Sequence, residues 1–256
     1  MIRDSLRFKG GAAAVLLFLF CLPALQAQFR PGKPFIEAET GGVFPGYCDV
    51  GIPGDTGTRF SLTGDLSTPS SLFLRLRAGF TLGRRHSVVV LYAPLSLEGS
   101  GRVPYPIRFF GVTFPADTPL RSVYRFNSYR VSYRYGLKND EGLNIGVGFT
   151  AKIRDAAIKL GGGGRESEKT NVGFVPIINF LLEWRFSPAW RLLLEGDALA
   201  APQGRAEDVF VGLVYQKSDD WALKLGYRIL EGGADNVKVY NFALLHYLAV
   251  GAIFYF

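Results

Sequence analysis

Residues that could carry acid–base or nucleophilic chemistry are few in this chain. Its 256 residues include two histidines and two cysteines. A general base must lie within hydrogen-bond reach of the proton that it takes. His86 precedes Ser87 in a predicted tight turn, and His246 is followed by Tyr247 and Leu248, so neither sits in a catalytic pattern. We predict no catalytic residues, and an enzyme acting on lipid or peptide stays open as an alternative function.

The string Asp55-Thr56-Gly57-Thr58 matches the residues around an aspartic-protease carboxylate. That chemistry needs two carboxylates that share one proton, and the string occurs once. Pro53 and Gly54 directly before it favour a turn over the strand that normally leads into the motif. We interpret the string as part of a loop.

Residues 161–164 are four consecutive glycines, followed by the charged stretch 165–169. A glycine-rich loop that cradles phosphate needs a strand before it and a helix after it. The pattern after residue 164 predicts no helix. We therefore expect a flexible extracellular loop here and no nucleotide site.

The first 27 residues have the pattern of a secretory signal peptide. Their start is basic, residues 12–22 are apolar, and Ala27 offers a small residue for cleavage. The apolar core is about half of the roughly 20 residues that a spanning helix needs. We predict that residues 1–27 are removed and that residues 28–256 form one exported domain.

Charge and cysteine content narrow the classes of partner. Removing three basic residues and one acidic residue with the leader lowers the net charge from +7 to +5. For an exported chain, lipid or lipopolysaccharide phosphates are better counterparts than nucleic acid. Cys48 is then the only cysteine, which excludes an internal disulfide and a cysteine-based metal site. We expect no metal and no cofactor.

Apolar and polar residues alternate along most of the exported region, a period typical of strands with one apolar face. Leu72, Leu74 and Leu76 take one parity, whereas Arg75 and Arg77 take the other. No stretch after Ala27 reaches 18 uncharged apolar residues, which excludes an ordinary membrane helix. Alternation predicts ten strands at 35–44, 71–83, 86–98, 121–137, 142–159, 171–187, 190–201, 207–218, 220–231 and 237–255.

The connections between these strands alternate in length, with tight turns on one side and mostly longer segments on the other. The longer ones are 45–70, 99–120, 160–170, 202–206 and 232–236. An even strand number with short periplasmic turns and long extracellular loops is typical of outer-membrane barrels. We predict an all-β fold, a closed antiparallel transmembrane β-barrel of about 10 strands, with 8 to 12 compatible with the pattern.

In such a barrel the polar parity faces the lumen. Opposite charges there can pair, and a narrow barrel is filled by side chains. We therefore expect a charge network in place of a wide pore. The residues predicted to form it are Glu37, Glu39, Arg75, Arg77, Arg130, Arg134, Lys152, Arg154, Glu183, Arg185, Glu195, Asp197, Lys224 and Arg228.

The closing run 244–256 resembles the last strand of bacterial outer-membrane β-barrel proteins, which typically ends in Phe after alternating apolar residues. Phe256, Phe254, Ala252 and Val250 fit that alternation. His246 departs from it, because it places a polar group on the apolar parity. The resemblance is to the small OmpA-like or ten-stranded class as an architecture, and it implies that the barrel-assembly machinery recognises this end.

Residues 99–120 carry large rings among several prolines. Tyr105, Phe109, Phe110 and Phe114 would be exposed on an ordinary loop, and exposed aromatic clusters mark contact sites or segments folded over another surface. A lid or strand extension and a contact site both fit. We predict a non-enzymatic outer-membrane barrel with a structural or surface-contact role, and a narrow porin-like channel for small solutes is a further alternative.

Overall fold

The computed structural model describes residues 33–202 and 204–256. The predicted leader, residues 1–27, lies outside these ranges. Within them the chain is built from strands, turns and loops, and no helix is long and apolar enough to cross a membrane.

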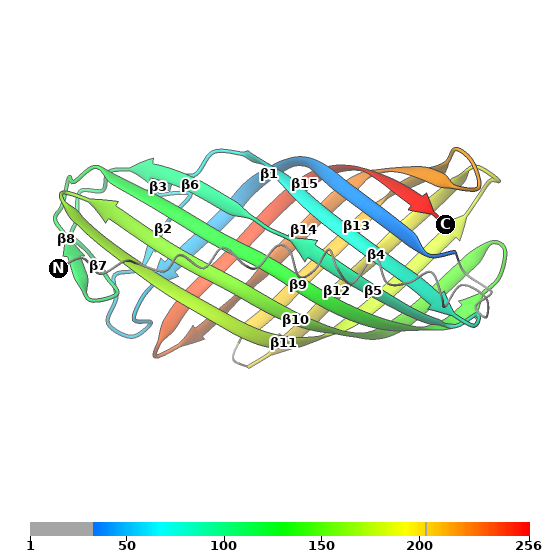
Figure 1. Cartoon of the computed structure of the whole chain (residues 1–256). Helices are drawn as coiled ribbons and strands as arrows, with labels where there is room; N and C mark the ends of the chain where they lie inside the picture. Colours follow the sequence, from blue (N-terminus) through cyan, green and yellow to red (C-terminus); the bar gives the residue numbers. More distant parts are fainter. Residues whose placement is uncertain (1–32, 203) are drawn as a thin grey trace, which may run out of the picture.

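The described residues form a closed antiparallel barrel of ten strands (Figure 1). β5 and β6 both pair with β9 and act as one strand that is interrupted at Pro94 and Leu95. β1 pairs with both β15 and β4, which closes the ring and confirms the predicted fold. The barrel strands are β1 (Phe35–Gly51), β4 (Ser71–Leu82), β5 (His86–Ala93) with β6 (Ser96–Gly101), β9 (Leu120–Asn139), β10 (Leu143–Gly162), β11 (Arg165–Arg185), β12 (Trp190–Ala201), β13 (Gly204–Gln216), β14 (Trp221–Asn236) and β15 (Val239–Tyr255).

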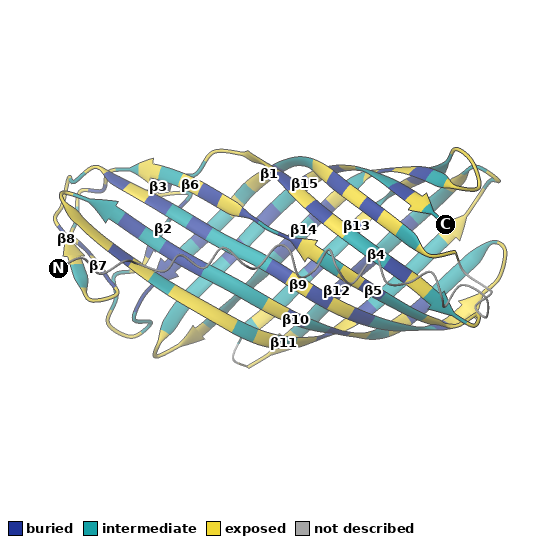
Figure 2. Cartoon of the chain, viewed as in Figure 1, coloured by how far each residue is buried: buried dark blue, intermediate teal, exposed yellow. Residues whose placement is uncertain are grey.

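The predicted apolar parity faces outward on these strands. Leu72, Phe149 and Leu225 are 80%, 62% and 61% exposed, whereas Arg130 on the opposite parity is 4% exposed. Figure 2 shows the resulting bands of buried and exposed residues along each strand. Because successive side chains of a strand point to opposite faces, this pattern gives the barrel an apolar outside and a polar interior.

The two ends of the barrel differ. One, the turn end, has short connections at 83–85, 140–142, 186–189 and 217–220, and β15 ends there. The other, the loop end, carries the long segments 52–70 and 102–119. Figure 1 shows the loop end at the left and the turn end at the right.

Three of the predicted long connections are tight hairpins instead. β10 continues to Gly162 and β11 begins at Arg165, so 160–170 is no flexible loop; Gly163 and Gly164 turn the chain with φ of 57° and 74°. Two successive positive φ values suit a two-residue hairpin, and glycine adopts them without strain. Predicted loops 202–206 and 232–236 are likewise mostly strand. Glycines in these stretches favoured a loop prediction, but Gly204, Gly232 and Gly233 are paired in the β13–β14 ladder.

The segments 52–70 and 102–119 fold into a cap at the loop end. They contain the short strands β2 (Phe60–Ser61), β3 (Leu66–Ser67), β7 (Ile107–Phe109) and β8 (Val112–Phe114), and β7 and β8 form their own hairpin. Backbone bonds join the two segments: Phe110 N–H donates to the Ile52 carbonyl at 2.7 Å, and Thr58 N–H donates to the Arg108 carbonyl at 2.9 Å. Since β2 and β3 only add to the edges of β1 and β6, they leave the barrel at ten strands.

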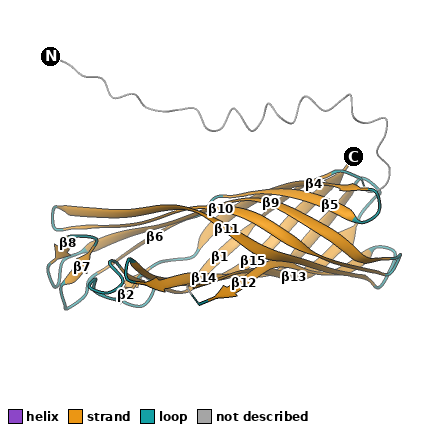
Figure 3. Cartoon of the chain, turned by 90° about the horizontal axis from the view of Figure 1, so that it is seen from below, coloured by secondary structure: helices purple, strands orange, loops and turns teal. Residues whose placement is uncertain are grey.

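The ring of strand pairs is open between β11 and β12 toward the loop end. β11 pairs with β12 only from Ile178, opposite Ala198, to the turn end, whereas its pairing with β10 continues to Arg165. Among the described residues, 165–177 of β11 therefore have a strand partner on one side only. Pro176 lies on this edge, where proline is tolerated in a sheet. Figure 3 shows the two sides of the barrel separating toward the loop end.

Candidate functional site in the barrel lumen

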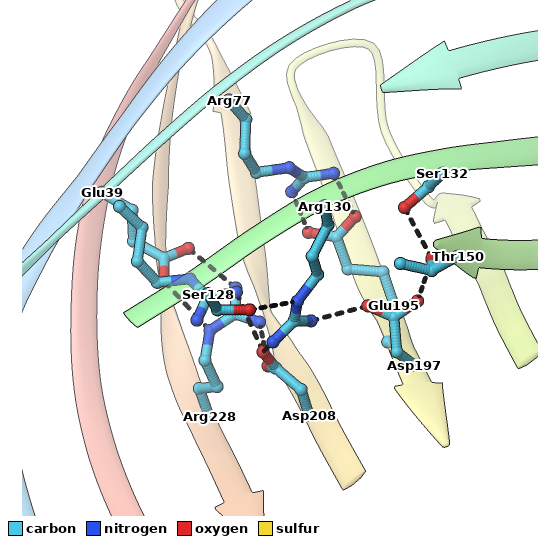
Figure 4. A network of polar contacts seen from close by, with 12 residues as sticks. Glu39, Arg77, Ser128, Arg130, Ser132, Thr150, Glu195, Asp197, Asp208 and Arg228 are labelled. Atoms are coloured by element: carbon cyan, nitrogen blue, oxygen red, sulfur yellow. Dashed lines mark hydrogen bonds and ion pairs between the residues drawn. The ribbon is translucent and has the colours of Figure 1, made fainter. Parts of the chain in front are cut away.

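Ten charged side chains form a layer across the middle of the lumen. Figure 4 shows part of it, around Glu39, Asp208 and Arg228. Five are acidic and five are basic, so the layer as defined here carries no net charge. All are at most about one-eighth exposed. We call this set the central layer; it consists of Glu37, Glu39, Arg75, Arg77, Arg130, Glu195, Asp197, Asp208, Lys224 and Arg228.

Asp208 on β13 is the acceptor at the centre of the layer. Its carboxylate lies 3.0 Å from Arg75 Nη2, 2.6 Å from Arg130 Nη2 and 2.7 Å from Arg228 Nη1. Arg228 also donates two hydrogen bonds of 3.0 Å to Glu39, in the bidentate geometry that suits guanidinium and carboxylate. Four strands on different sides of the barrel are thereby joined through one carboxylate.

Lys224 on β14 is the second centre of the layer. Its ammonium lies 2.8 Å from Glu37, 3.0 Å from Glu39 and 3.0 Å from Glu195, and it is fully buried. Arg77 reaches Glu195 at 2.5 Å and Glu37 at 3.3 Å. An ammonium has three donors. Lys224 donates hydrogen bonds to Glu37 and Glu195, and its contact with Glu39 is an ion pair.

Neutral polar groups extend the layer toward β10 and β11. Thr150 donates to Asp197 at 2.5 Å and shares a bond of 2.6 Å with Ser132. Asn179 donates to Asp197 at 2.8 Å and accepts from Arg134 Nε at 2.7 Å. A buried charge is better tolerated when its remaining donors and acceptors are also satisfied, and these groups satisfy part of the layer. Arg75 Nε and Arg130 Nη2 stay buried without a hydrogen-bond partner.

Little open space remains in this part of the lumen. The cavity bounded by Arg75, Arg130, Glu195 and Asp208 has a volume of about 40 Å³. That is enough for a water molecule or two, because one water needs roughly 10–15 Å³ by the same measure. The side chains of the layer therefore fill most of the space around this cavity.

Of the 14 residues predicted to form one lumen network, the structure brings nine into the central layer and adds Arg134 through Asn179. Four lie outside it. Lys152 and Arg154 face a separate cavity, Glu183 pairs with Arg191 at 3.4 Å, and Arg185 is exposed at the turn end. Alternation predicts the face of a side chain but not its height along the tilted barrel, which decides what it meets.

The prediction missed Asp208. The preceding loop was expected to extend to residue 206, which placed Asp208 at a strand end, and its parity is shared with Phe210, an apolar residue. Phe210 is fully buried inside the lumen, where Lys224 Nζ lies 4.0 Å from its ring centroid. A Cβ on Gly212 or Gly226 would collide with this ring, so the glycines make room for it.

A larger cavity of about 490 Å³ lies between the central layer and the loop end. Five basic residues and one acid line it: Lys152, Arg154, Lys169, Arg205, Lys238 and Glu231. We call it the loop-end cavity. Glu231 is already paired with Arg205 and accepts from Tyr47. The cavity therefore has an excess of positive charge, in contrast to the balanced layer below it.

The aromatic residues predicted as contact candidates divide into two groups. Phe109 and Phe114 are fully buried in the cap, where the Phe109 ring meets Phe60 edge-on at 6.3 Å, so they are no surface contacts. Tyr105 packs against the same core. Phe110 is 44% exposed at the tip of the β7–β8 hairpin. Residues 102–119 therefore form part of a folded cap with its own apolar core.

Both histidines meet tyrosine hydroxyls. His86 Nδ1 lies 2.8 Å from Tyr133 Oη at the turn end, and His246 Nδ1 bonds Tyr227 on the outer face. Among the described residues neither histidine pairs with a carboxylate. β15 keeps its pairing with β14 through His246, and Gly46, at the bulge in β1, leaves space for the imidazole ring.

Metal binding has no candidate in the part of the chain that the structure describes. No group of three or more His, Cys, Asp or Glu side chains there is arranged to hold an ion. Cys48 is buried as a free thiol.

No protein-family model matches the chain, and no curated protein matches it in sequence. In structure the chain is similar to the outer membrane protease OmpT from Escherichia coli, with a TM-score of 0.56 and 8% sequence identity over 90% of this chain and 99% of OmpT. The transport unit of the autotransporter AIDA-I from Escherichia coli gives a TM-score of 0.47 at 7% identity, over 95% of this chain and 97% of that one. The translocator domain of the autotransporter NalP from Neisseria meningitidis gives 0.42 at 13% identity, over 95% and 96%.

At 8% identity the likeness to OmpT concerns the path of the chain and not its chemistry. The strand pairing and the outward apolar parity lead to the same result from the coordinates alone. The chain therefore has the fold of the ten-stranded bacterial outer-membrane β-barrels.

Proposed function

We propose that this protein is an exported, non-enzymatic barrel of the bacterial outer membrane with a structural or surface-contact role, exercised through its capped loop end. The observation that carries the proposal is the cap. Ile107, Phe109 and Phe114 are fully buried in it, so it is a folded surface and not a set of mobile loops. A folded surface loses little conformational entropy on contact with a partner.

Membrane placement is supported by the outer face of the strands. On β11 the outward apolar residues run from Trp184 to Phe174, 51% and 67% exposed. At about 3.3 Å per residue and a tilt near 40°, this run spans roughly 25 Å, the height of the apolar band in outer-membrane barrels. Outer-membrane lipid and lipopolysaccharide are the partners of this face, and the signal peptide ending near Ala27 is the route of export.

Assembly is proposed to use the end of β15. Phe254 is 51% exposed and Phe256 is 68% exposed, and Val250 continues the same outward row. The barrel-assembly machinery would recognise this row, as the resemblance of the last strand implies. This is tested by replacing Phe256 with Lys, which we expect to lower the amount of protein inserted in the outer membrane.

Cell fractionation and gel mobility test the placement. We expect the mature protein in the outer-membrane fraction, with an N-terminus at Gln28, and faster migration in an unboiled sample than in a boiled one. Recovery as a soluble periplasmic protein, or identical migration of the two samples, would contradict the proposal.

The channel alternative is tested by planar-bilayer recording. The central layer leaves a cavity of about 40 Å³, so the inserted wild-type barrel is expected to give no conductance steps. Regular single-channel steps from protein that passes the gel-mobility test would favour the channel instead.

The contact role is tested on cells that express the full chain. Phe110 projects from the cap with a φ of 41°, a backbone conformation that is strained for a phenylalanine and that the hairpin holds. We expect expressing cells to aggregate or attach more than control cells, and Phe110→Ser to reduce the effect. Exposed Phe80 on β4 gives the matched control, Phe80→Ser, which lies away from the cap. Equal attachment with and without the protein would remove the contact role.

A further inference from the structure

The loop-end cavity has a positively charged lining, an apolar wall and unpaired strand edges beside it. The contact role proposed above gives none of these features a function. Its volume of about 490 Å³ falls within the range of small-molecule sites, roughly 300–1,000 Å³.

Lys152 is a buried cation in the wall of this cavity. Its side chain is 4% exposed and lines the cavity, and its ammonium lies 4.9 Å from the centroid of the Phe126 ring. Within residues 33–202 and 204–256 the structure gives it no carboxylate partner within 4.0 Å. An ammonium that is withdrawn from water without an acid is costly, and an anionic group would relieve that cost.

Arg154 lies beside Lys152 on the lumen face of β10. It donates to Asn171 at 2.5 Å, while its Nε is buried without a hydrogen-bond partner. Two residues apart on a strand, the two cations point to the same side. Together they present an ammonium and a guanidinium to one bound anion, which is the donor set that carboxylates and phosphates accept from.

The remaining wall is apolar. Phe126, Ala156, Ile158, Val175, Leu199 and Ala206 line the cavity with carbon. A free inorganic anion would leave this surface in contact with water. A molecule with an anionic headgroup and a hydrocarbon chain would cover both parts.

The pairing of β11 with β12 ends beside this cavity. Val175 lies on the β11 side of it and Leu199 on the β12 side, just beyond the last pair, Ile178 with Ala198. The outer surface here is apolar, since Val172 is 69% exposed and Phe174 is 67% exposed. At this height the opening faces the outer edge of the apolar band estimated above.

We propose that the loop-end cavity binds a single-chain amphipathic anion, which enters from the surrounding lipid between β11 and β12, with its headgroup on Lys152 and Arg154 and its chain against Phe126, Val175 and Leu199. The proposal rests on the membrane placement proposed above but not on the contact role. A carboxylate or a phosphate headgroup satisfies the same two cations.

The test uses the full mature chain in nanodiscs of zwitterionic lipid, after the gel-mobility shift has shown that the barrel is folded. The probe is 11-(dansylamino)undecanoic acid, whose fluorescence rises in an apolar site. We expect saturable binding above that of empty nanodiscs, displaced by laurate and by dodecyl phosphate. Inorganic phosphate at the same concentration should displace little probe, and neutral dodecanol should displace less than laurate.

Two variants address the headgroup and the chain separately. Lys152→Met is expected to weaken probe binding at least 10-fold, because one charge-assisted bond of about 1.5–3 kcal/mol corresponds to that factor or more. Leu199→Trp is expected to reduce affinity by filling the chain site. Lys217→Met, in an exposed turn at the other end of the barrel, is the matched control and should bind as the wild type does.

Each outcome bears on the proposal. Binding that Lys152→Met leaves unchanged would overturn the headgroup site, and displacement by inorganic phosphate as strong as by laurate would replace the amphipathic ligand with a free anion. Absence of saturable binding by a folded, heat-modifiable barrel would overturn the inference and leave the proposed membrane placement intact.

Discussion

The central layer and the loop-end cavity lie in the same lumen but differ in charge balance. In the layer, five acids and five bases pair within a space that leaves a cavity of about 40 Å³. In the cavity above, five bases face one acid across about 490 Å³. Buried charges are stable when they are paired, and a surplus of one sign indicates space kept for something else.

The difference arises from which strands complete the ring. Around the layer every strand pairs on both sides, so side chains from β1, β4, β9, β12, β13 and β14 converge. Around the cavity β11 no longer has β12 as a neighbour. Where the ring of strands is complete, opposite charges meet across the lumen. Where β11 and β12 are unpaired, cations line a cavity instead. Substitutions in the two regions should therefore have opposite consequences.

The largest effect is expected at Asp208. Asp208→Ala leaves Arg75, Arg130 and Arg228 without their shared acceptor, and removal of one partner from a buried ion pair costs about 3–5 kcal/mol. We expect a loss of about 4–5 kcal/mol in urea unfolding of the reconstituted barrel. Asp219→Asn, in an exposed turn, should change stability by less than about 0.5 kcal/mol. A loss below about 1 kcal/mol for Asp208→Ala would mean that the layer is not cooperative.

The cap over the cavity should respond locally. Phe109→Ala removes a fully buried ring, a change that costs about 3–4 kcal/mol in a packed core. Because the barrel below has its own strand pairing, we expect faster proteolysis within 102–119 and an unchanged barrel unfolding midpoint. Phe110→Ala, next to it but exposed, should leave the cleavage rate close to that of the wild type. Unfolding of the whole barrel by Phe109→Ala would show that cap and barrel are one cooperative unit.

The same substitution in each region gives the sharpest comparison. Lys224→Met leaves its three acids with Arg75, Arg77 and Arg228 as remaining partners, and we expect a loss of about 2–3 kcal/mol. Lys152→Met removes a charge that lacks an acid partner, so it should change stability by less than about 1 kcal/mol or increase it. Chemical unfolding of the two variants side by side measures this. Equal losses would mean that both lysines are paired in solution.

The smallest effect is expected outside both regions, in the turn at 140–142. Asp140 accepts from Leu143 N–H at 2.7 Å, and this bond, together with the Lys138 ammonium, holds the pKa of its carboxyl below the usual value. A lowered pKa in the folded state adds stability above the ordinary aspartate pKa of about 3.9, and that stability is lost as the pH falls through the folded value. Asp140→Asn should therefore be slightly less stable than the wild type at pH 7, with the difference vanishing near pH 2. A difference that persists in acid would point to the hydrogen bonds alone.

The amino-acid sequence by itself determined the strands and their faces. Alternation is a local property with a period of two, so Leu72 and Arg75 can be assigned to opposite faces without knowing their neighbours. The even strand number and the apolar parity of β15 followed in the same way, and the structure confirms both.

Only the tertiary structure decided what those faces meet. Strand tilt and register set the height of each side chain, and for this reason Glu37 joins Lys224 while Lys152 stands apart from the acids. The central role of Asp208 and the burial of Phe109 depend on strands and segments that are far apart in the chain. The opening beside β11 also depends on the tertiary structure. The residues of a strand specify only weakly whether it has a neighbour, and here the opening arises because β12 pairs with β11 only from Ile178 onward. Pairing at long range carries no local period, and this is the physical reason that it had to be seen in the folded barrel.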